Sequence, residues 1–177
     1  MRSTLLLSAV LLSVSVFCAE NEYKPGLIGE YFAIGAELMD FPNIAAERKA
    51  NVIKVDPVVN IPHADQGFNG SDLTDQFYIR WTGAIKIEKD GKYTFFTESD
   101  DGSRLFIDGK VIVENGGQHG MVEKSGELEL KAGYHEVKLE FFEDGGGAGC
   151  ILKWLPAGAE KAVIPASVLF HKKGLDK

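Results

Sequence analysis

The sequence is poor in cysteine, with only Cys18 and Cys150 among its 177 residues. Small exported domains that depend on disulfides carry several closely spaced cysteines. Cys18 lies in an N-terminal apolar stretch, so Cys150 is the one cysteine in the remaining chain. Cys150 precedes Ile151 and Leu152, a context typical of a buried small hydrophobic side chain rather than a nucleophile. Stability is therefore expected from core packing or bound ions, not from disulfides.

Basic residues are also scarce. The chain has 19 Lys and Arg against 26 Asp and Glu, a formal net charge of −7. The pair Lys172-Lys173 near the C-terminus is not a basic cluster. A phosphate backbone is bound by clustered Lys and Arg, so nucleic acid is not expected as a partner.

Long hydrophobic runs are absent apart from Leu5–Phe17, and these 13 residues are too few to span a bilayer comfortably. Arg2 before this run and small residues after it form the pattern of a secretory signal. We predict a signal peptide over residues 1–19 and one domain over 20–177. The protein would then be secreted, periplasmic or at the cell surface, without stable membrane insertion. An uncleaved membrane anchor and a lipid anchor at Cys18 remain as alternatives.

Motifs for catalysis are missing too. The histidines do not stand at metal-binding spacing, and no G-x-S-x-G sequence is present. The glycine run at 145–149 lies between predicted strands, unlike a dinucleotide-binding turn. A glycosidase needs two carboxylates that face one sugar bond, and no acid in the sequence is indicated by its context as the partner of Asp100 or Asp101. We therefore expect a protein that is not an enzyme. The four histidines are His63, His119, His135 and His171.

Alternating apolar residues dominate the sequence from residue 77 onward. A period of two predicts strands that bury one face. Asp-Gly pairs at Asp90-Gly91 and Asp108-Gly109 favour tight turns between strands. Short strands separated by such turns predict an all-β fold, an antiparallel β-sandwich or barrel. The strands are expected at 26–34, 58–61, 77–87, 92–98, 104–113, 126–131, 136–142 and 151–155, with a short helix at 44–51 and a loop at 63–75.

The two tryptophans are expected in the core of this fold. Trp81 alternates with Ile79, and Trp154 follows Leu152 in a short strand. Large aromatic residues within apolar alternation are usually buried.

One polar segment, Asp100-Asp101-Gly102-Ser103, interrupts the strand pattern. Adjacent side chains on a strand point to opposite faces, so two adjacent Asp share an ion only where the backbone leaves the strand. Ca²⁺ takes about 6–8 oxygen ligands from carboxylates, carbonyls and water. The glycine-rich segment after Glu143 would supply carbonyl oxygens. The alternative is a solvated hairpin turn, since Asp, Gly and Ser are common turn residues.

Four segments resemble a known family. They are FYIRWTGAI, DGKYTFFTESDDGSRLFIDGKVIV, GELELKAGYHEVKLEFFEDGGGAGCILKW and IPASVLF. In this order they resemble the anthrax protective-antigen-type ("PA fourteen") domain, found in toxins, yeast flocculins and bacterial glycosidases. The resemblance covers about residues 25–170 and implies an antiparallel β-sandwich. In the lectin members, two adjacent Asp joined by a cis peptide bind Ca²⁺, and sugar hydroxyls complete the coordination.

The resemblance implies a site at Asp100 and Asp101. Asp144, Gly145 and Gly147 lie in the loop that corresponds to the second calcium-binding segment. The polar loop 115–120 would reach a ligand, so Gln118 and His119 join the two acids as candidate carbohydrate-binding residues.

The expected function is a secreted, calcium-dependent carbohydrate-binding module. Its partners would be a glycan or polysaccharide, and cell-surface proteins are a second class. The alternative is a non-catalytic structural or protein-interaction module of an envelope or secreted assembly, without a sugar ligand.

Overall fold

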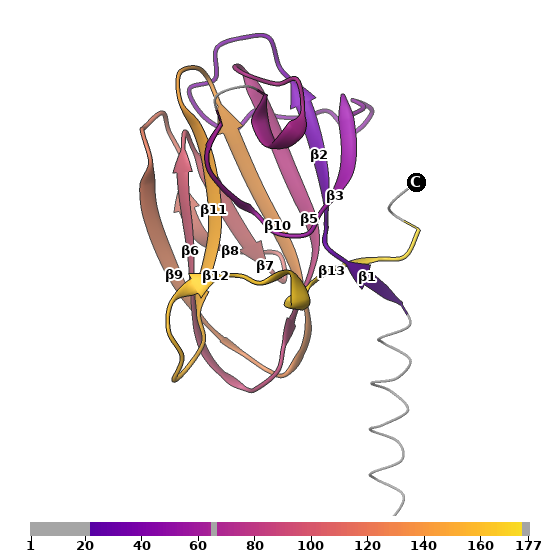
Figure 1. Ribbon diagram of the computed structural model, residues 1–177, viewed down its shortest axis with the longest axis vertical. Coiled ribbons are helices and arrows are strands. Elements are labelled where there is room, and N and C mark those ends of the chain that lie inside the picture. The colour runs from indigo at the N-terminus through magenta and orange to yellow at the C-terminus, as the bar shows by residue number, and fades with distance from the viewer. Residues whose placement is uncertain (1–21, 65–66, 175–177) are drawn as a thin grey trace, which may run out of the picture.

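A computed structural model describes residues 22–64 and 67–174. The predicted signal segment 1–19, with Cys18, lies outside these residues. The described chain is built almost wholly of strands in two antiparallel sheets, which confirms the predicted all-β sandwich (Figure 1).

The larger sheet has eight strands, and its main path runs in the order β1-β13-β5-β10-β7-β8, while β2 pairs with β5 and β3 with β2. The smaller sheet runs β12-β11-β6-β9, with β4 beside β11. The larger sheet contains β1 (Tyr23–Pro25), β2 (Leu27–Ala33), β3 (Val52–Asp56), β5 (Phe77–Ile87), β7 (Ser103–Ile107), β8 (Lys110–Asn115), β10 (Gly133–Glu143) and β13 (Leu169–Lys172). The smaller sheet contains β4 (Asn60–Ala64), β6 (Gly91–Asp100), β9 (Val122–Leu130), β11 (Ala148–Leu155) and β12 (Ala162–Val163). Two short 3-10 turns are η1 (Phe68–Gly70) and η2 (Ala166–Val168).

The core lies between the two sheets and follows the predicted alternation. Odd-numbered apolar residues of β5 and β10, such as Ile79 and Leu139, point inward and are buried. Trp81 is also fully buried, as predicted. Trp154 is only partly buried and packs at the margin of the core beside Tyr93, with ring centroids 5.9 Å apart. The even-numbered residues of β5 and β10 therefore form the outer face of the larger sheet.

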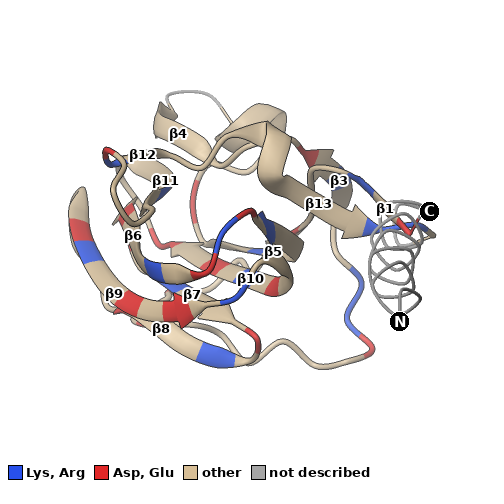
Figure 2. Ribbon diagram, turned by 90° about the horizontal axis from the view of Figure 1, so that it is seen from below, with Lys and Arg blue, Asp and Glu red and all other residues tan. Residues whose placement is uncertain are grey.

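One side of the sandwich is closed by a close approach of β8 to β9. A Cβ atom on Gly126 would lie 1.8 Å from the carbonyl oxygen of Ile112. Glycine is therefore required at this position of β9. Along β9, acidic and basic residues stand next to one another rather than forming a basic strip (Figure 2).

The turn at Asp108-Gly109 forms as expected. Both residues have positive φ, 48° and 74°, and they join β7 to β8. The Asp-Gly pair thus supplies the left-handed backbone that a two-residue hairpin needs. The prediction of a tight hairpin turn at Asp90-Gly91 is wrong, because Gly91 begins β6 of the smaller sheet, whereas the preceding β5 belongs to the larger sheet.

The prediction of a helix at 44–51 is wrong. The segment has no helix, only a turn in which the Arg48 amide donates to the Ala45 carbonyl at 3.0 Å. Its apolar residues spread over the outer face of the larger sheet, where Ile44 packs against a cluster of Phe32, Tyr78 and Phe142. Tertiary packing therefore overrides the local helix preference.

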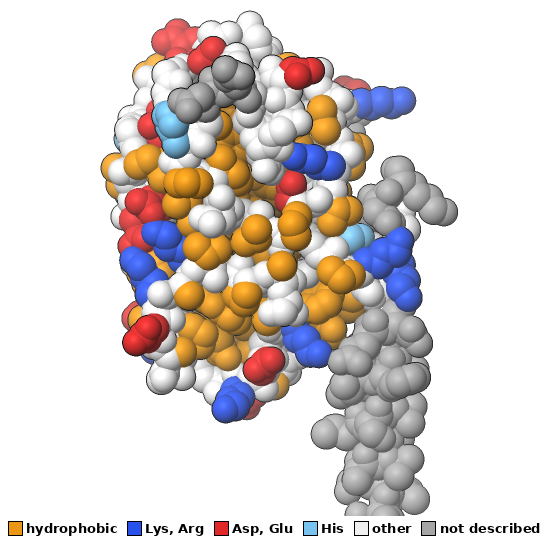
Figure 3. All heavy atoms as spheres, in the orientation of Figure 1, with side chains coloured by type: hydrophobic (Ala, Val, Ile, Leu, Met, Phe, Trp, Pro, Cys, Tyr) orange, Lys and Arg blue, Asp and Glu red, His pale blue; other side chains and the backbone are white. Residues whose placement is uncertain are grey.

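Over residues 22–64 and 67–174, no helix has both the length and the hydrophobicity needed to cross a bilayer. Figure 3 shows hydrophobic side chains reaching the surface on one face of the sandwich, over β11, β12 and β13, with charged side chains around them.

Candidate functional site

Three chain connections between the sheets meet at one end of the sandwich. Residues 101–102 lead from β6 to β7, residues 116–121 from β8 to β9, and residues 144–147 from β10 to β11. The arrowheads of β6 and β10 point to the same end in Figure 1. Residues from all three connections line one hollow of about 370 Å³, here called the acidic hollow: Asp100, Asp101, Gln118, His119, Gly120, Asp144 and Gly145.

The acid pair is not a hairpin turn, so that alternative reading is wrong. Asp100 ends β6 in the smaller sheet, and Ser103 begins β7 in the larger sheet. The peptide bond between Asp100 and Asp101 is cis, as the family resemblance implied. Glycine is required at position 102, because a Cβ atom there would lie 2.3 Å from the Phe142 ring. Both carboxylates line the same hollow.

Asp101 joins the other two connections. It is 6% exposed, and its two oxygens accept different backbone N–H groups. The His119 amide donates to Oδ1 at 2.8 Å, and the Asp144 amide donates to Oδ2 at 3.0 Å. A buried carboxylate that accepts hydrogen bonds from backbone amides is held in one orientation. Asp101 therefore positions both loops around the acidic hollow.

Asp144 and Gln118 brace the hollow on its outer side. The Leu38 amide donates to Asp144 Oδ1 at 2.7 Å. The Gln118 side-chain amide donates to Asp144 Oδ2 at 3.0 Å and to the Leu38 carbonyl at 3.1 Å. The donor end of Gln118 is therefore used within the protein, and its Oε1 is the end left for a ligand.

The His119 ring turns toward its own loop. Nδ1 lies 2.9 Å from the Gly120 carbonyl oxygen, and Nε2 lies 3.2 Å from the Asn115 carbonyl oxygen. The backbone of His119, rather than its ring nitrogens, thus contacts Asp101.

Asp100 faces the glycine-rich connection. A Cβ atom on Gly147 would lie 3.3 Å from Asp100 Oδ2, so the Gly147 backbone passes close to this carboxylate. Gly145 lines the hollow, whereas Gly147 does not. Burial and then the charge of Asp101 raise the pKa of Asp100, while His119 and His63 act to lower it. The imidazole of His63, which sequence reasoning treated as a loop residue, is therefore close enough to affect Asp100.

Glu143 lies buried behind the acid pair. Its Oε2 accepts the Asp101 amide at 3.0 Å, and its Oε1 has no hydrogen-bond partner. Burial, followed by the charges of Asp101 and Asp100, raises the pKa of Glu143 to about 8. Sequence reasoning did not select Glu143, although extending the inward alternation of Val137 and Phe141 by two residues places it on the core side.

A buried polar layer supports the hollow from below. The Ser99 and Ser103 hydroxyls lie 2.6 Å apart, and Asn115 donates to Ser99 Oγ at 3.2 Å and to the Val122 carbonyl at 2.9 Å. These contacts link the ends of β6, β7 and β8 to the start of β9. They fix the strand ends that flank two of the three connections, residues 101–102 and 116–121.

Within the described parts of the chain, no three His, Cys, Asp or Glu side chains cluster closely enough to hold a metal ion by themselves. An ion in the acidic hollow would therefore need carbonyl, water or ligand oxygens in addition to carboxylates, which is an ordinary arrangement for Ca²⁺.

Comparison with known proteins identifies a family and a curated relative. The family model described as the PA14 domain matches residues 23–167. The anti-sigma-I factor RsgI3 of Acetivibrio thermocellus is 29% identical over 155 residues, which are 87% of this chain and 22% of that protein. This chain thus spans only a minor part of that relative.

Solved structures agree in fold. An anti-sigma factor domain-containing protein superposes with a TM-score of 0.73 at 26% identity, covering 85% of this chain and 50% of that one. A PA14 sugar-binding domain from an RTX adhesin superposes with a TM-score of 0.69 at 20% identity, covering 83% of this chain and 98% of that one.

Proposed function

The chain belongs to the PA14 domain family, and on this premise we propose that it is a secreted, calcium-dependent carbohydrate-binding module that catalyses no reaction itself. The observation that carries the proposal is the acidic hollow, where Asp100 and Asp101 face one opening between three connecting loops. The similarity in fold to a sugar-binding domain of an adhesin supports it.

The donor set fits calcium. Asp100 and Asp101 supply hard carboxylate oxygens, and the glycine-rich connection brings peptide groups beside them. Glu143 lies directly behind the pair with one oxygen unpartnered, and its pKa of about 8 keeps it mostly protonated at neutral pH. Burial and the charge of Asp101 raise the pKa of Asp100, so a divalent cation would stabilise the ionised pair.

In this proposal Asp144 is a further calcium ligand. Each of its oxygens accepts one hydrogen bond, and a carboxylate oxygen has a second lone pair. Asp144 can therefore brace the loops and still face an ion. Sugar hydroxyls and water would complete the coordination, with Gln118 Oε1 and the His119 loop at the rim.

The second candidate is a non-catalytic protein-interaction module of a secreted or envelope assembly. The similarity to RsgI3, an anti-sigma-I factor, supports it. The two candidates differ in whether any glycan binds at the acidic hollow.

Glycan-array binding and thermal unfolding, each with calcium and with EDTA, test the proposal. At calcium concentrations about 100 times the Kd, the Tm should rise by roughly 5–10 °C, because the ion binds only the native state. Asp101→Asn should abolish this rise and every EDTA-sensitive glycan signal.

Asp72→Asn is the matched control, because Asp72 is exposed and does not line the acidic hollow. It should behave as the unmodified protein. A Tm that ignores calcium would rule out the metal site. A calcium-dependent Tm without EDTA-sensitive binding to any glycan would favour the interaction module.

A further inference from the structure

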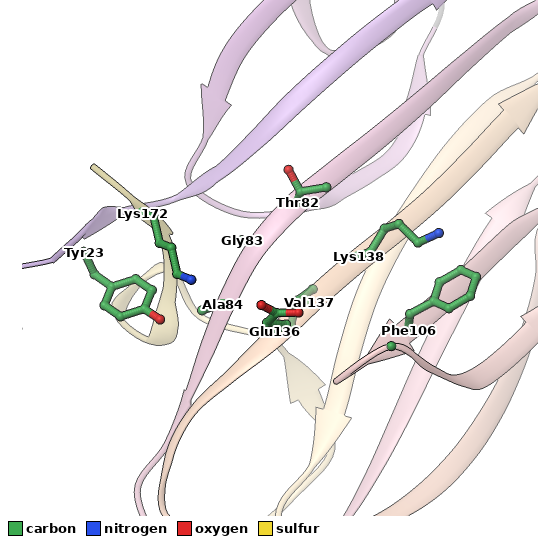
Figure 4. A pocket seen from close by; sticks show the side chains of 10 residues that line it. Tyr23, Thr82, Gly83, Ala84, Phe106, Glu136, Val137, Lys138 and Lys172 are labelled. Carbon is green, nitrogen blue, oxygen red and sulfur yellow. The ribbon is translucent and has the colours of Figure 1, made fainter. Parts of the chain in front are cut away.

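A second concave surface lies away from the acidic hollow, on the outer face of the larger sheet. This groove has a volume of about 390 Å³, within the ~300–1,000 Å³ range usual for ligand sites. In Figure 4, Glu136 lies between Tyr23 and Lys172 on one side and Phe106 and Lys138 on the other. Its lining comes from five adjacent strands and the turn at Gly109.

The strand register sets the order of these side chains across the sheet. Lys138 stands opposite Thr82 on β5 and opposite Phe106 on β7. Glu136 stands opposite Ala84 on β5, and Tyr23 stands opposite Lys172. Four inter-strand spacings separate β1 from β7, roughly 19 Å at ~4.8 Å each. The groove is therefore long enough for a chain molecule rather than one small ring.

The floor of the groove is made of small residues. Thr82, Gly83 and Ala84 follow one another on β5 beneath the larger side chains. Ala84 is covered, with 3% of its surface exposed, whereas Thr82 and Gly83 are partly exposed. A flat ring can therefore approach the sheet most closely over Thr82 and Gly83.

Aromatic rings stand at both ends. Tyr23 stacks on Tyr134 with centroids 4.2 Å apart and an interplanar angle of 6°. Tyr134 in turn meets Phe170 edge-on at 5.5 Å, so Tyr23 is held by a cluster rather than free to rotate. Phe106 marks the other end, with Lys138 Nζ 3.7 Å from its ring centroid. The Phe106 ring is also contacted by Arg104, whose guanidinium carbon lies 5.2 Å from the centroid, so its surface is already used by two cations. The fixed ring of Tyr23 is the one that suits the apolar face of a sugar, and it loses little entropy on binding.

Charges of both signs line the groove. Lys138, Lys172 and Glu136 belong to its lining, and Lys138 also pairs at 3.0 Å with Glu140, which lies outside the lining and accepts from Arg104 as well. The groove thus offers ammonium donors beside a carboxylate acceptor rather than a strong charge of one sign. This combination suits an uncharged ligand rich in hydroxyl groups, which both donate and accept hydrogen bonds.

A peptide cannot add a strand over the middle of this surface. β13, β5, β10 and β7 each have partners on both sides, and of the strands that line the groove only β1 is an edge strand. Recognition in the groove must come from side chains.

We propose that this groove is a second binding site, independent of metal, for an uncharged polysaccharide chain that lies across β1, β13, β5, β10 and β7. A sugar ring packs on Tyr23, and hydroxyls of successive rings along the chain bond to Lys172, Glu136 and Lys138. The inference goes beyond the calcium site and does not depend on it, because the two surfaces share no lining residue.

Affinity electrophoresis of the full chain in excess EDTA tests the site, with xylan, galactomannan or a soluble β-glucan in the gel. At least one of these neutral polysaccharides should retard the protein. The double variant Glu136→Ala/Lys172→Ala should weaken that retardation at least about tenfold, since hydrogen bonds from charged groups are lost. Asp101→Asn should leave it unchanged.

The matched control is Lys92→Ala/Glu127→Ala, which removes an exposed ion pair of 2.6 Å on the smaller sheet. It should bind as the unmodified protein does. Absence of retardation by all three neutral polysaccharides, or equal losses in the two double variants, would overturn the proposal. So would retardation by polygalacturonate alone, or dimerisation that the groove variant abolishes, which would assign the surface to a polyanion or to a second copy.

Discussion

At the scale of single residues, Glu140 on the outer face of the larger sheet shows how a nearly buried charge is tolerated. It is 8% exposed and accepts hydrogen bonds from Arg104 at 2.7 Å, Lys138 at 3.0 Å and the Tyr78 hydroxyl at 2.9 Å. Burial acts to raise the pKa of Glu140, but these three donors lower it more, so the pKa lies below its ordinary 4.5. The ionised form is therefore the stabilising one.

The pH dependence follows from the sign of this shift. A carboxyl group whose pKa is lowered by folding stabilises the protein above its unfolded pKa and loses that contribution as pH falls through the folded value. Glu140→Gln should lower the free energy of unfolding at pH 7 by about 1–3 kcal/mol and should flatten its decline below about pH 4.5. Urea unfolding at pH 7 and pH 3 measures both.

Glu127→Gln is the control for Glu140→Gln, because the Glu127 side chain is 56% exposed and pairs only at the surface. Its effect should stay within about 0.5 kcal/mol at either pH. Parallel pH profiles for the protein and Glu140→Gln would contradict the role given to Glu140.

At the scale of elements, Asp56 holds separate parts of the larger sheet together. It ends β3 and is 4% exposed. It accepts hydrogen bonds from Tyr31 of β2 at 2.6 Å, Trp81 of β5 at 2.7 Å and Asn69 of η1 at 3.0 Å. A Cβ on Gly29 would lie 2.5 Å from Asp56 Oδ2, so glycine makes room for this carboxylate. The side chain of Asp56 thus links β3 by hydrogen bonds to β2, β5 and η1.

Asp56→Ala should lower the free energy of unfolding by about 3 kcal/mol or more, because it leaves buried Tyr and Trp donors without an acceptor. Asp72→Ala, at an exposed position, should change it by less than about 0.5 kcal/mol. Guanidinium unfolding followed by tryptophan fluorescence compares the two. Equal losses would mean that Asp56 is not the link between these elements.

At the scale of the whole molecule, one core cluster runs between the two sheets, and Cys150 lies inside it. The cysteine is fully buried on β11, and burial raises the pKa of its thiol. Since the thiolate is the reactive form, both access and ionisation are suppressed in the native state. The thiol of Cys150 therefore reports opening of the core as a unit.

Labelling with Ellman's reagent should consequently follow global unfolding. In a Cys18→Ala background, the Cys150 thiol should react slowly in buffer and fully in denaturant, at the same midpoint as fluorescence. Val111→Ala at the exposed β8 surface should leave the labelling rate unchanged. Fast labelling in buffer would show that β11 opens locally without the rest of the core.

Much of the fold could be predicted from local sequence. The alternation around Ile79 and Leu139 reflects burial of one strand face, and Asp108-Gly109 provides a backbone that few other residues adopt. The segment 44–51 was mispredicted because its apolar residues match a surface made by residues far away in sequence, including Tyr78 and Phe142. Local preference carries no information about such a surface.

The sequence by itself determined that this chain forms antiparallel strands, that Asp108-Gly109 is a tight turn and that Asp100-Asp101 departs from the strand pattern. These depend on side-chain period and backbone sterics, which act between near neighbours. The family resemblance, with the polar loop at 115–120, implied that Asp100, His119 and Asp144 belong to one site, but strand patterns alone could not place them together. They meet because the connections after β6, β8 and β10 pass between the two sheets at the same end of the sandwich. Only the tertiary structure decided that Tyr23 and Phe106 flank one groove, since strand order across a sheet is set by long-range pairing.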